Sequence, residues 1–365
     1  MSNGKARKGW KKVKTTDILT GIITGKKDVN QAEQSGEYPF FSCARETTLF
    51  SNEFLLDKDA ILVSGNGSYT GFVKAYSGKF DLYQRTYALF DFKEGVNWRF
   101  IYYLFKYYFE QRYMGGTSGA AIPYITKPIL TDFEFFVPED NSIQNEISSI
   151  LTAYDDLIEN NRRRIQLLEE SARLLYKEWF VQLRFPGHEH VKIIDGVPEG
   201  WSNKPIKEIL TLNYGKALQA DLREPGEFPV YGSSGVVGSH NKPLVKAPGI
   251  IVGRKGNVGS VFWVSKDYWP IDTVYFVIPE ESSLYLYHAL QKVSFINTDV
   301  AVPGLNRDMA YSREILMPTD NVLNLFHDEV EPIQRQIEKL GEYNNKLSEA
   351  RDILLPRLMN GALVV

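Results

Sequence analysis

The chain has 365 residues, a formal net charge of −3 and 43% hydrophobic residues. This length supports two or more domains with real cores, and the slightly acidic balance argues against binding nucleic acid through overall positive charge. A single cysteine, Cys43, excludes an intramolecular disulfide and a cysteine-based metal site. No apolar run is long enough to span a membrane, and no signal-peptide core follows the basic start, so we expect a cytoplasmic protein.

Residues 1–140 alternate short apolar runs with turn signals, which predicts a first domain of strands and helices. The expected elements are strands at 18–19, 36–41 and 60–63, a buried aromatic helix at 96–109, and a closing strand at 131–137. Cys43 lies in the run Phe-Ser-Cys-Ala and is expected to be a small core residue in a strand.

Residues 141–180 then read as one long helix that no Gly or Pro interrupts. Its residues recur at alternating spacings of three and four, the pattern of a coiled-coil seam. The two lines of the seam are Leu151, Ile158, Ile165, Ala172 and Trp179, and Ile147, Tyr154, Asn161, Leu168 and Leu175. At about 1.5 Å per residue the helix would be roughly 60 Å long, and such a seam needs a partner.

A second helix, expected over 321–360, can supply that partner. Its seam lines are Val330, Ile337, Asn344, Arg351 and Leu358, and Phe326, Ile333, Leu340, Leu347 and Leu354. Asn161 and Asn344 both fall on seam lines, where a buried Asn typically fixes the register. Pro332 and Pro356 should bend this helix or limit its length. The alternative is two unrelated surface helices packed on separate cores.

Residues 181–200 form a linker rich in Pro and Gly, and residues 201–320 then repeat the first domain. The linker carries His188-Glu189-His190; with no third ligand nearby, we expect a solvated turn rather than a metal site. In the repeat, Trp201 corresponds to Trp10, Gly215-Lys216 to Gly25-Lys26, 226–231 to 36–41, 249–252 to 60–63, and Thr273 to Thr86. A repeat of this size indicates a duplicated domain rather than a solenoid.

Connectivity then suggests an arrangement of these parts. The first domain leads into one end of the first helix, and the second domain follows its other end. If the seams pack, the helices are antiparallel. We therefore predict an α+β fold: two duplicated target-recognition domains, mixed β with helices, at opposite ends of a pair of long antiparallel coiled-coil helices. Two related readers held at a fixed distance suit a polymer with two-fold-like symmetry, such as duplex DNA.

Two glycine-rich runs follow strands, at 65–71 and 253–259. Neither has the GxGxxG spacing of a dinucleotide site, and both lead into β-type sequence, so hairpin turns are expected. Glycine also lets a backbone approach a phosphate, and Arg, Lys and Asn read base edges or bind phosphates. The candidate DNA-contacting residues are Lys26, Asn66, Ser68, Tyr69, Lys74 and Lys127 in the first half, and Lys216, Arg254, Lys255, Asn257 and Arg307 in the second.

The sequence contains no recognisable catalytic arrangement. It has no P-loop and no Asn/Asp-Pro-Pro-aromatic motif of the kind that methyltransferases use, and its five His are scattered without triad or ligand spacing. We therefore expect a chain that recognises something while other subunits act on it.

This combination resembles the specificity subunit of type I restriction–modification enzymes. The features that carry the resemblance are the two strand-plus-glycine runs, Ala-Ile-Pro at 121–123, Ala-Val-Pro at 301–303, the helix ends at 167–175 and 350–355, and the run from Lys177 to Pro186. The family's usual Pro-Pro-x-x-Glu-Gln entry to each helix is replaced here by segments that begin with Asp140-Asn141 and Asp320-Asn321.

The resemblance implies that each domain reads one half of a bipartite, asymmetric DNA target and that the helices set the unread spacer. It also implies two modification subunits, which hold S-adenosylmethionine and methylate adenine, and a restriction subunit that acts as motor and nuclease. This chain would then be non-catalytic, with no cofactor or metal of its own, and its partners would supply much of the phosphate-neutralising surface. The alternative is a coiled-coil protein-interaction scaffold with two end domains and no DNA binding.

Overall fold

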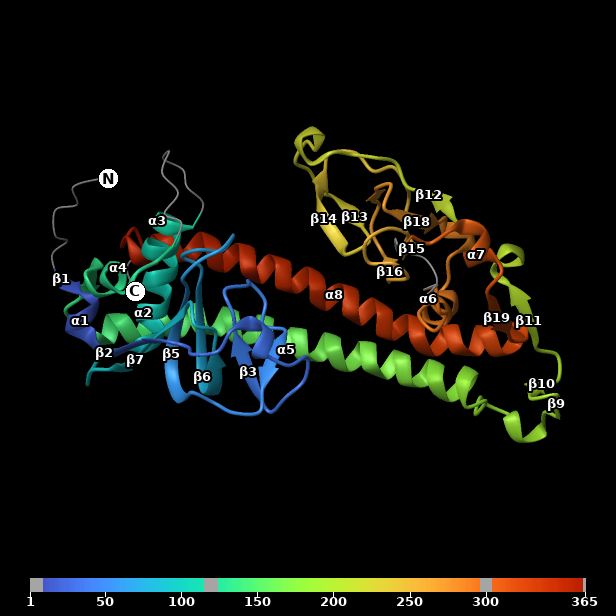
Figure 1. Ribbon diagram of the computed structural model, residues 1–365, viewed down its shortest axis with the longest axis horizontal. Coiled ribbons are helices and arrows are strands. Elements are labelled where there is room, and N and C mark those ends of the chain that lie inside the picture. The colour runs from blue at the N-terminus through green and yellow to red at the C-terminus, as the bar shows by residue number, and fades with distance from the viewer. Residues whose placement is uncertain (1–8, 115–123, 296–303, 364–365) are drawn as a thin grey trace. The chain divides into compact units, whose positions relative to one another are not determined.

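The computed structural model describes residues 9–114, 124–295 and 304–363, and it divides into two compact units (Figure 1). Unit 1 comprises residues 1–160 and 343–365, and unit 2 comprises residues 161–342. The two long helices, α5 (Asn141–Tyr176) and α8 (Asp320–Met359), each contribute one part to each unit. In the described residues, no helix is both long and apolar enough to cross a membrane. The predicted Ala-Ile-Pro and Ala-Val-Pro segments lie outside the described residues.

Unit 1 is built on a sheet with the strand order β2-β7-β5-β6-β3-β4. Its strands are β2 (Leu19–Thr24), β3 (Tyr38–Phe41), β4 (Leu49–Ser51), β5 (Leu56–Ser64), β6 (Val73–Leu82) and β7 (Thr86–Phe92). Alternate side chains of the central strand β5 point to opposite faces of the sheet. Ile61 and Val63 therefore pack in the larger core with the helices, whereas Ala60 and Leu62 pack in a second core on the other face.

Short helices and one further strand pair complete unit 1. The remaining elements are β1 (Trp10–Lys14), which pairs with β8 (Glu134–Pro138), the helices α1 (Thr15–Ile18), α2 (Trp98–Leu104), α3 (Gln111–Tyr113) and α4 (Lys127–Thr131), the 3₁₀ turn η1 (Val29–Gln31), and the π-helical segment η2 (Phe105–Glu110). The predicted strands at 36–41 and 60–63 and the aromatic helix at 96–109 are confirmed, although η2 forms the second half of that helix.

Three local predictions for unit 1 are wrong. Ile18 ends the helix α1 rather than starting a strand, because the Asp17 carboxylate accepts a hydrogen bond from the backbone N–H of Lys14 and caps a helical turn. The closing strand begins only at Glu134, since Thr131 ends α4. Cys43 lies in the loop after β3 and is half-buried, and its sulfur contacts the carbonyl oxygen of Arg85 at 3.4 Å.

Unit 2 contains sheets with the strand orders β12-β18-β15-β16 and β14-β13-β17. Their strands are β12 (Asn213–Tyr214), β13 (Phe228–Gly232), β14 (Gly235–His240), β15 (Gly249–Gly253), β16 (Val261–Val264), β17 (Trp269–Pro270) and β18 (Val274–Val277). The other elements are β11 (Ser202–Pro205), which pairs with β19 (Glu314–Met317), β9 (Ile193–Ile194), which pairs with β10 (Val197–Pro198), α6 (Leu284–Leu290), α7 (Arg307–Tyr311), and the short helical segments η3 (Lys177–Val181), η4 (His188–His190), η5 (Ile206–Glu208), η6 (Ala220–Leu222) and η7 (Pro279–Glu281). The segment His188–His190 forms the exposed 3₁₀ turn η4, in agreement with the predicted solvated turn.

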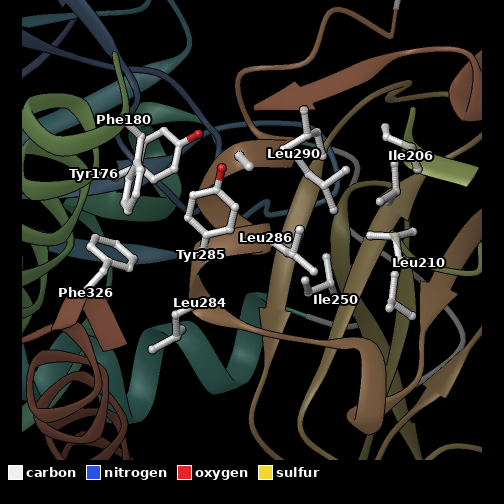
Figure 2. Packing of buried hydrophobic residues seen from close by; sticks show 14 of the residues in the cluster. Tyr176, Phe180, Ile206, Leu210, Ile250, Leu284, Tyr285, Leu286, Leu290 and Phe326 are labelled. Carbon is white, nitrogen blue, oxygen red and sulfur yellow. The ribbon is translucent and has the colours of Figure 1, made fainter. Parts of the chain in front are cut away.

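Aromatic residues from both long helices close the core of unit 2. Figure 2 shows the rings of Tyr176, Phe180 and Phe326 grouped around Tyr285 of α6. The ring centroids of Phe180 and Phe326 are 5.0 Å apart and those of Phe180 and Tyr285 are 4.7 Å apart, both in edge-to-face geometry. Apolar side chains of α6 belong to the same cluster, as do Ile250 and Val252 of β15, whereas Ile251 packs in a separate cluster.

The corresponding helix segments also meet in unit 1. Ile147 and Leu151 of α5 share a buried cluster with Leu358 of α8. One helical turn further along α5, the Asp155 carboxylate pairs with the Arg351 guanidinium at 2.5 Å. Both helix segments therefore contribute to the core of this unit, and one ion pair joins them.

The predicted seam residues are buried or half-buried, as a packed seam requires. The buried ones are Ile147, Leu151, Ile158, Asn161, Ala172, Trp179, Phe326, Val330, Leu340 and Leu358, and the half-buried ones are Tyr154, Ile165, Leu168, Leu175, Ile333, Ile337, Asn344, Leu347, Arg351 and Leu354. Pro332 does not limit the length of the second helix, because α8 continues through it and ends three residues after Pro356, and the expected bend stays a prediction. Pro332 is exposed, so the carbonyl group that its ring displaces can be hydrated.

Gly215→Ala is predicted to destabilise unit 2, because a Cβ at this position would overlap the carbonyl oxygen of Ile271. We expect the free energy of unfolding to fall by about 1–3 kcal/mol. Gly341→Ala is the control: no atom lies within 4 Å of a Cβ there, and alanine inside α8 should add about 0.5–1 kcal/mol. Urea unfolding of the full chain measures both changes. A Gly215→Ala protein as stable as wild type would contradict the prediction.

Candidate nucleic-acid interface

In unit 1 the turn between β5 and β6 lies at the centre of a group of loops. The backbone N–H of Gly65 donates to the carbonyl of Arg85, which precedes β7, at 2.8 Å. The carbonyl of Gly65 accepts from the N–H of Ile125 at 2.7 Å, and Asn66 forms a β-bridge with Tyr124. Backbone hydrogen bonds therefore hold the segments around 65, 85 and 125 at one edge of the unit.

Unit 2 contains the same arrangement after β15. The N–H of Arg254 donates to the carbonyl of Thr273 at 2.9 Å, and the carbonyl of Arg254 accepts from the N–H of Leu305 at 2.8 Å. Lys255 forms a β-bridge with Gly304. The turn after β5 and the turn after β15 therefore have matching partners, and we call these two sites the turn edges of units 1 and 2.

Glycines with positive φ shape both turn edges. Gly67 and Gly71 have φ values of +80° and +85°, and Gly256 and Gly259 have +78° and +80°. Only glycine adopts this conformation at low cost, so the spacing of glycines in the two runs reflects the turn itself. The predicted hairpin turns are confirmed, because β5 leads into β6 and β15 leads into β16.

A parallel strand pair lies beside each turn edge. In unit 1, β3 runs parallel to β6, and the N–H of Tyr83 donates to the carbonyl of Phe41 at 3.0 Å. In unit 2, β13 runs parallel to β17, and the N–H of Ile271 donates to the carbonyl of Tyr231 at 2.9 Å. The repeat read from the sequence therefore extends to backbone pairing, with one correction: Thr273 takes the place of Arg85, not of Thr86.

At the turn edge of unit 1 most of the candidate side chains are open to solvent. Lys26, Ser68, Tyr69 and Lys127 are exposed, and Asn66 is half-buried. Ser68 and Tyr69 occupy the tip of the turn, whereas Lys127 begins α4. The structure therefore brings Asn66, Ser68 and Tyr69 together on one turn, with the segment that contains Lys127 bonded beside it.

Lys74 is placed differently, because its side chain folds back against its own unit. Its ammonium donates to the carbonyl of Ala44 at 2.8 Å and to the Thr47 hydroxyl at 3.3 Å, and it lies over the rings of Phe41 and Phe72. Burial lowers the pKa of Lys74 from 10.5 to about 8. In this structure the ammonium therefore orders the loop after β3 rather than facing solvent.

At the turn edge of unit 2 the basic side chains gather around an aromatic ring. The guanidinium carbons of Arg254 and Arg307 each lie 5.0 Å from the ring centroid of Tyr214. Lys255 is exposed and lies 3.8 Å from the Asp272 carboxylate. The other two candidates, Lys216 and Asn257, are also exposed.

Sequence reasoning missed the ring of Tyr214, which is 49% exposed at the end of β12. The available signal was its position directly before Gly215-Lys216, a pair that the repeat had already marked. It also missed the exposed Tyr124 and Arg85, which the backbone pairing places beside the first turn. Aromatic and cationic groups at a turn edge provide stacking and phosphate contacts, which are the elements of nucleic-acid binding.

Comparison with known proteins identifies the family. Residues 7–170 and 198–318 match the family described as the type I restriction modification DNA specificity domain. The chain belongs to this family. The two matched stretches contain the two turn edges, and each extends over a sheet of the corresponding unit.

Similar proteins carry the same description. The chain is 29% identical to the type I restriction enzyme EcoDI specificity subunit of Escherichia coli, over 63% of this chain and 54% of that protein. It therefore spans about half the length of this relative. It is 26% identical to the MjaIX specificity subunit of Methanocaldococcus jannaschii, over 75% of this chain and 71% of that protein. The crystal structure of a type I restriction–modification S subunit from M. genitalium has a TM-score of 0.60 at 20% identity and covers 98% of both chains, which shows a shared fold.

Replacing Lys74 by methionine should alter how stability depends on pH. The pKa of Lys74 is about 8 in the folded chain and near 10.5 when it is exposed. Between these two pH values Lys74 carries its proton in the unfolded chain more often than in the folded chain. The free energy of unfolding of the wild type therefore rises with pH in this range, and Lys74→Met lacks this increase. Urea unfolding from about pH 7 to pH 10.5 should show the wild type rising relative to Lys74→Met. The exposed Lys79 on the same strand provides the control, Lys79→Met. Parallel pH profiles for wild type and Lys74→Met would contradict the prediction.

Proposed function

We propose that this chain is the DNA sequence-recognition subunit of a type I restriction–modification complex. Each unit contributes one target-recognition domain, residues 1–140 and 201–320, and each domain reads one half of a bipartite, asymmetric target. The two turn edges are the reading surfaces. The chain confers specificity, while methylation and cleavage belong to partner subunits.

The observation that carries this proposal is the repetition of the turn edge. The bonds from Ile125 to Gly65 and from Leu305 to Arg254 are the same bond in the two units, and each fixes a turn that displays polar and cationic side chains. A duplicated, rigid display with different side chains suits a target with two unlike halves. Membership of the DNA specificity domain family supports this assignment.

The individual DNA contacts form part of the proposal. The candidates at or beside the turn edges are assigned to bases or phosphates. Lys26, Ser68, Tyr69, Lys127, Lys216, Lys255 and Asn257 are exposed, and Asn66, Arg254 and Arg307 are half-buried. Lys74 is assigned an indirect role, because it holds the loop at Ala44.

We further propose that the spacer helices, 141–180 and 321–360, pack along their seams as an antiparallel coiled coil, and that the linker 181–200 leads from the first helix into the second domain. The local packing of α5 on α8 inside each unit supports this arrangement. In unit 1 the Asp155 carboxylate also accepts a hydrogen bond from the Tyr103 hydroxyl at 2.6 Å, in addition to its pair with Arg351. A charged pair of this kind is satisfied in one register only, so it opposes sliding of the helices.

The partners follow from the same assignment. Two modification subunits that carry S-adenosylmethionine would dock on the helices and domains and methylate adenine, and a restriction subunit would join them. The cofactor belongs to those subunits. Double-stranded DNA is the shared substrate of the complex.

The first test is methylation with and without partners. The purified chain alone should transfer no methyl group, because it lacks a methyltransferase motif. Combined with its modification subunits and S-adenosylmethionine, it should direct adenine methylation to one split sequence, which sequencing of the methylated DNA reveals. Methyl transfer by the single chain, or methylation of unsplit or unrelated sequences by the complex, would overturn the proposal.

The second test lengthens the first spacer helix, which we propose sets the distance between the two half-sites. Inserting four residues between Glu159 and Arg164 adds about one helical turn, roughly 6 Å. At about 3.4 Å per base pair, the unread spacer should lengthen by one or two base pairs while both half-sites stay the same. Substituting the exposed residues Asn160, Arg162 and Arg163 in place, without changing the length, is the control. A functional complex with an unchanged spacer would show that the helices do not set it, and altered half-site bases would show that the helix itself reads DNA.

A further inference from the structure

Three segments of unit 2 converge on the ring of Tyr214. This residue ends β12, Arg254 follows β15, and Arg307 begins α7. Both guanidinium groups lie within cation–π distance of the ring, at 5.0 Å from its centroid. Two positive charges are therefore gathered beside one exposed ring, which favours an anionic or electron-rich ligand at this place.

Arg254 is fixed at both its backbone and its side chain. Its N–H and carbonyl are bonded to Thr273 and Leu305, and its Nη1 donates to the carbonyl of Asp272 at 3.0 Å. Its guanidinium also lies 5.8 Å from the ring of Tyr275, whose hydroxyl donates to the carbonyl of Leu305 at 2.9 Å. The fork of N–H donors is therefore oriented before any ligand arrives, and little further side-chain freedom is lost on binding.

The neighbouring Lys255 is different, because its exposed ammonium has, among the described residues, only a long contact of 3.8 Å with the Asp272 carboxylate. A mobile point charge is sufficient for a phosphate, whereas a fixed planar fork matches a pair of acceptors held in one plane. In the major groove that pair is O6 and N7 of guanine.

Unit 1 lacks this arrangement at the matching positions. Thr24 is the residue of unit 1 that corresponds to Tyr214, because Thr24 pairs with Tyr87 as Tyr214 pairs with Tyr275. Gly65 corresponds to Arg254, because both make the same two backbone hydrogen bonds. Unit 1 thus has neither the guanidinium nor the exposed ring at these places.

Building on the DNA-recognition role proposed above, we propose that Arg254 reads a guanine in the half-site bound by unit 2, with Tyr214 as the residue that positions its guanidinium. Arg307, beside the same ring, supplies positive charge to the flanking backbone. The matching place in unit 1, at Gly65, makes no such contact, so this guanine belongs to one half-site only.

The test uses the full chain in complex with its modification subunits, a randomised DNA library, and sequencing of the methylated products. Arg254→Lys keeps the charge but loses the fork. It should relax one guanine in one half-site by roughly 5- to 150-fold and leave every other position as in wild type. Tyr214→Leu should relax the same guanine, whereas Tyr214→Phe should keep wild-type preference, because it retains the ring.

Lys255→Met is the matched control for a phosphate contact. It should weaken binding to all sequences alike and reduce the slope of log affinity against log salt by about one unit. Asn66→Ala in unit 1 should leave this guanine unchanged and affect only the other half-site.

The outcomes separate the two proposals. If the wild-type complex methylates no split sequence, the proposed function fails. If it does, and Arg254→Lys and Tyr214→Leu leave the motif unchanged or lower affinity for all sequences alike, Arg254 binds a phosphate or nothing and this inference fails. Thermal unfolding checks each variant; if Arg254→Lys does not fold, Tyr214→Leu decides the question, since it leaves Arg254 in place.

Discussion

The packing of both long helices into the core of each unit is the constraint on which the rest of the structure depends. In unit 1, Leu151 of α5 and Leu358 of α8 lie in the same buried cluster as Ile61 of the central strand. In unit 2, Tyr176 of α5 and Phe326 of α8 share a cluster with Ile250. Removing either helix segment would expose buried apolar surface to water, and each Å² exposed costs about 25 cal/mol of folding free energy. The sheet and the helix segments of each unit therefore share one core, and the sheet is not an independent folding unit attached to a helix.

This packing has a consequence for recognition. Each turn edge follows a central strand, β5 or β15, and backbone hydrogen bonds hold it in place. Side chains of the same strands lie in one core with the helix segments. A reading surface built in this way has a fixed direction relative to the helix that leaves its unit. If the helices pack as proposed, the distance between the half-sites is then a property of helix length and register. Apolar heptads alone permit slips of seven residues, and the Asp155–Arg351 pair opposes such slips in unit 1.

The regular features of the fold could be predicted because they repeat. The heptad lines predicted helices of nearly the observed lengths, and the glycine spacing predicted both turns. Local exceptions could not be read in this way. Ile18 looks like strand sequence, but the Lys14–Asp17 hydrogen bond caps a turn there. Pro332 is a helix breaker by propensity, but packing of the flanking turns, which include Phe326, retains the helix.

The candidate site was predictable in its position and less so in the direction of its side chains. Residue type marked Arg254 and Lys74 equally, since both are cations beside a turn. Their surroundings differ only in three dimensions: Lys74 lies between Phe41 and Phe72 with its ammonium bonded to its own chain. Tyr214 gave no signal as a partner of Arg254, because the two residues are 40 positions apart in the sequence and meet only through strand pairing.

The way in which the turn edges are built also explains how one fold can serve two unlike half-sites. The bonds that hold each edge join backbone groups, so they place no demand on the side chains at the same positions. Gly65 and Arg254 make the same pair of backbone contacts although one has no side chain and the other has a long cationic one. The next residues, Asn66 and Lys255, form matching β-bridges although one side chain is a neutral amide and the other a cation. Stability and specificity are therefore carried by different atoms of the same residues. Substitutions at these positions can alter the bases that are read while the backbone that presents them stays in place.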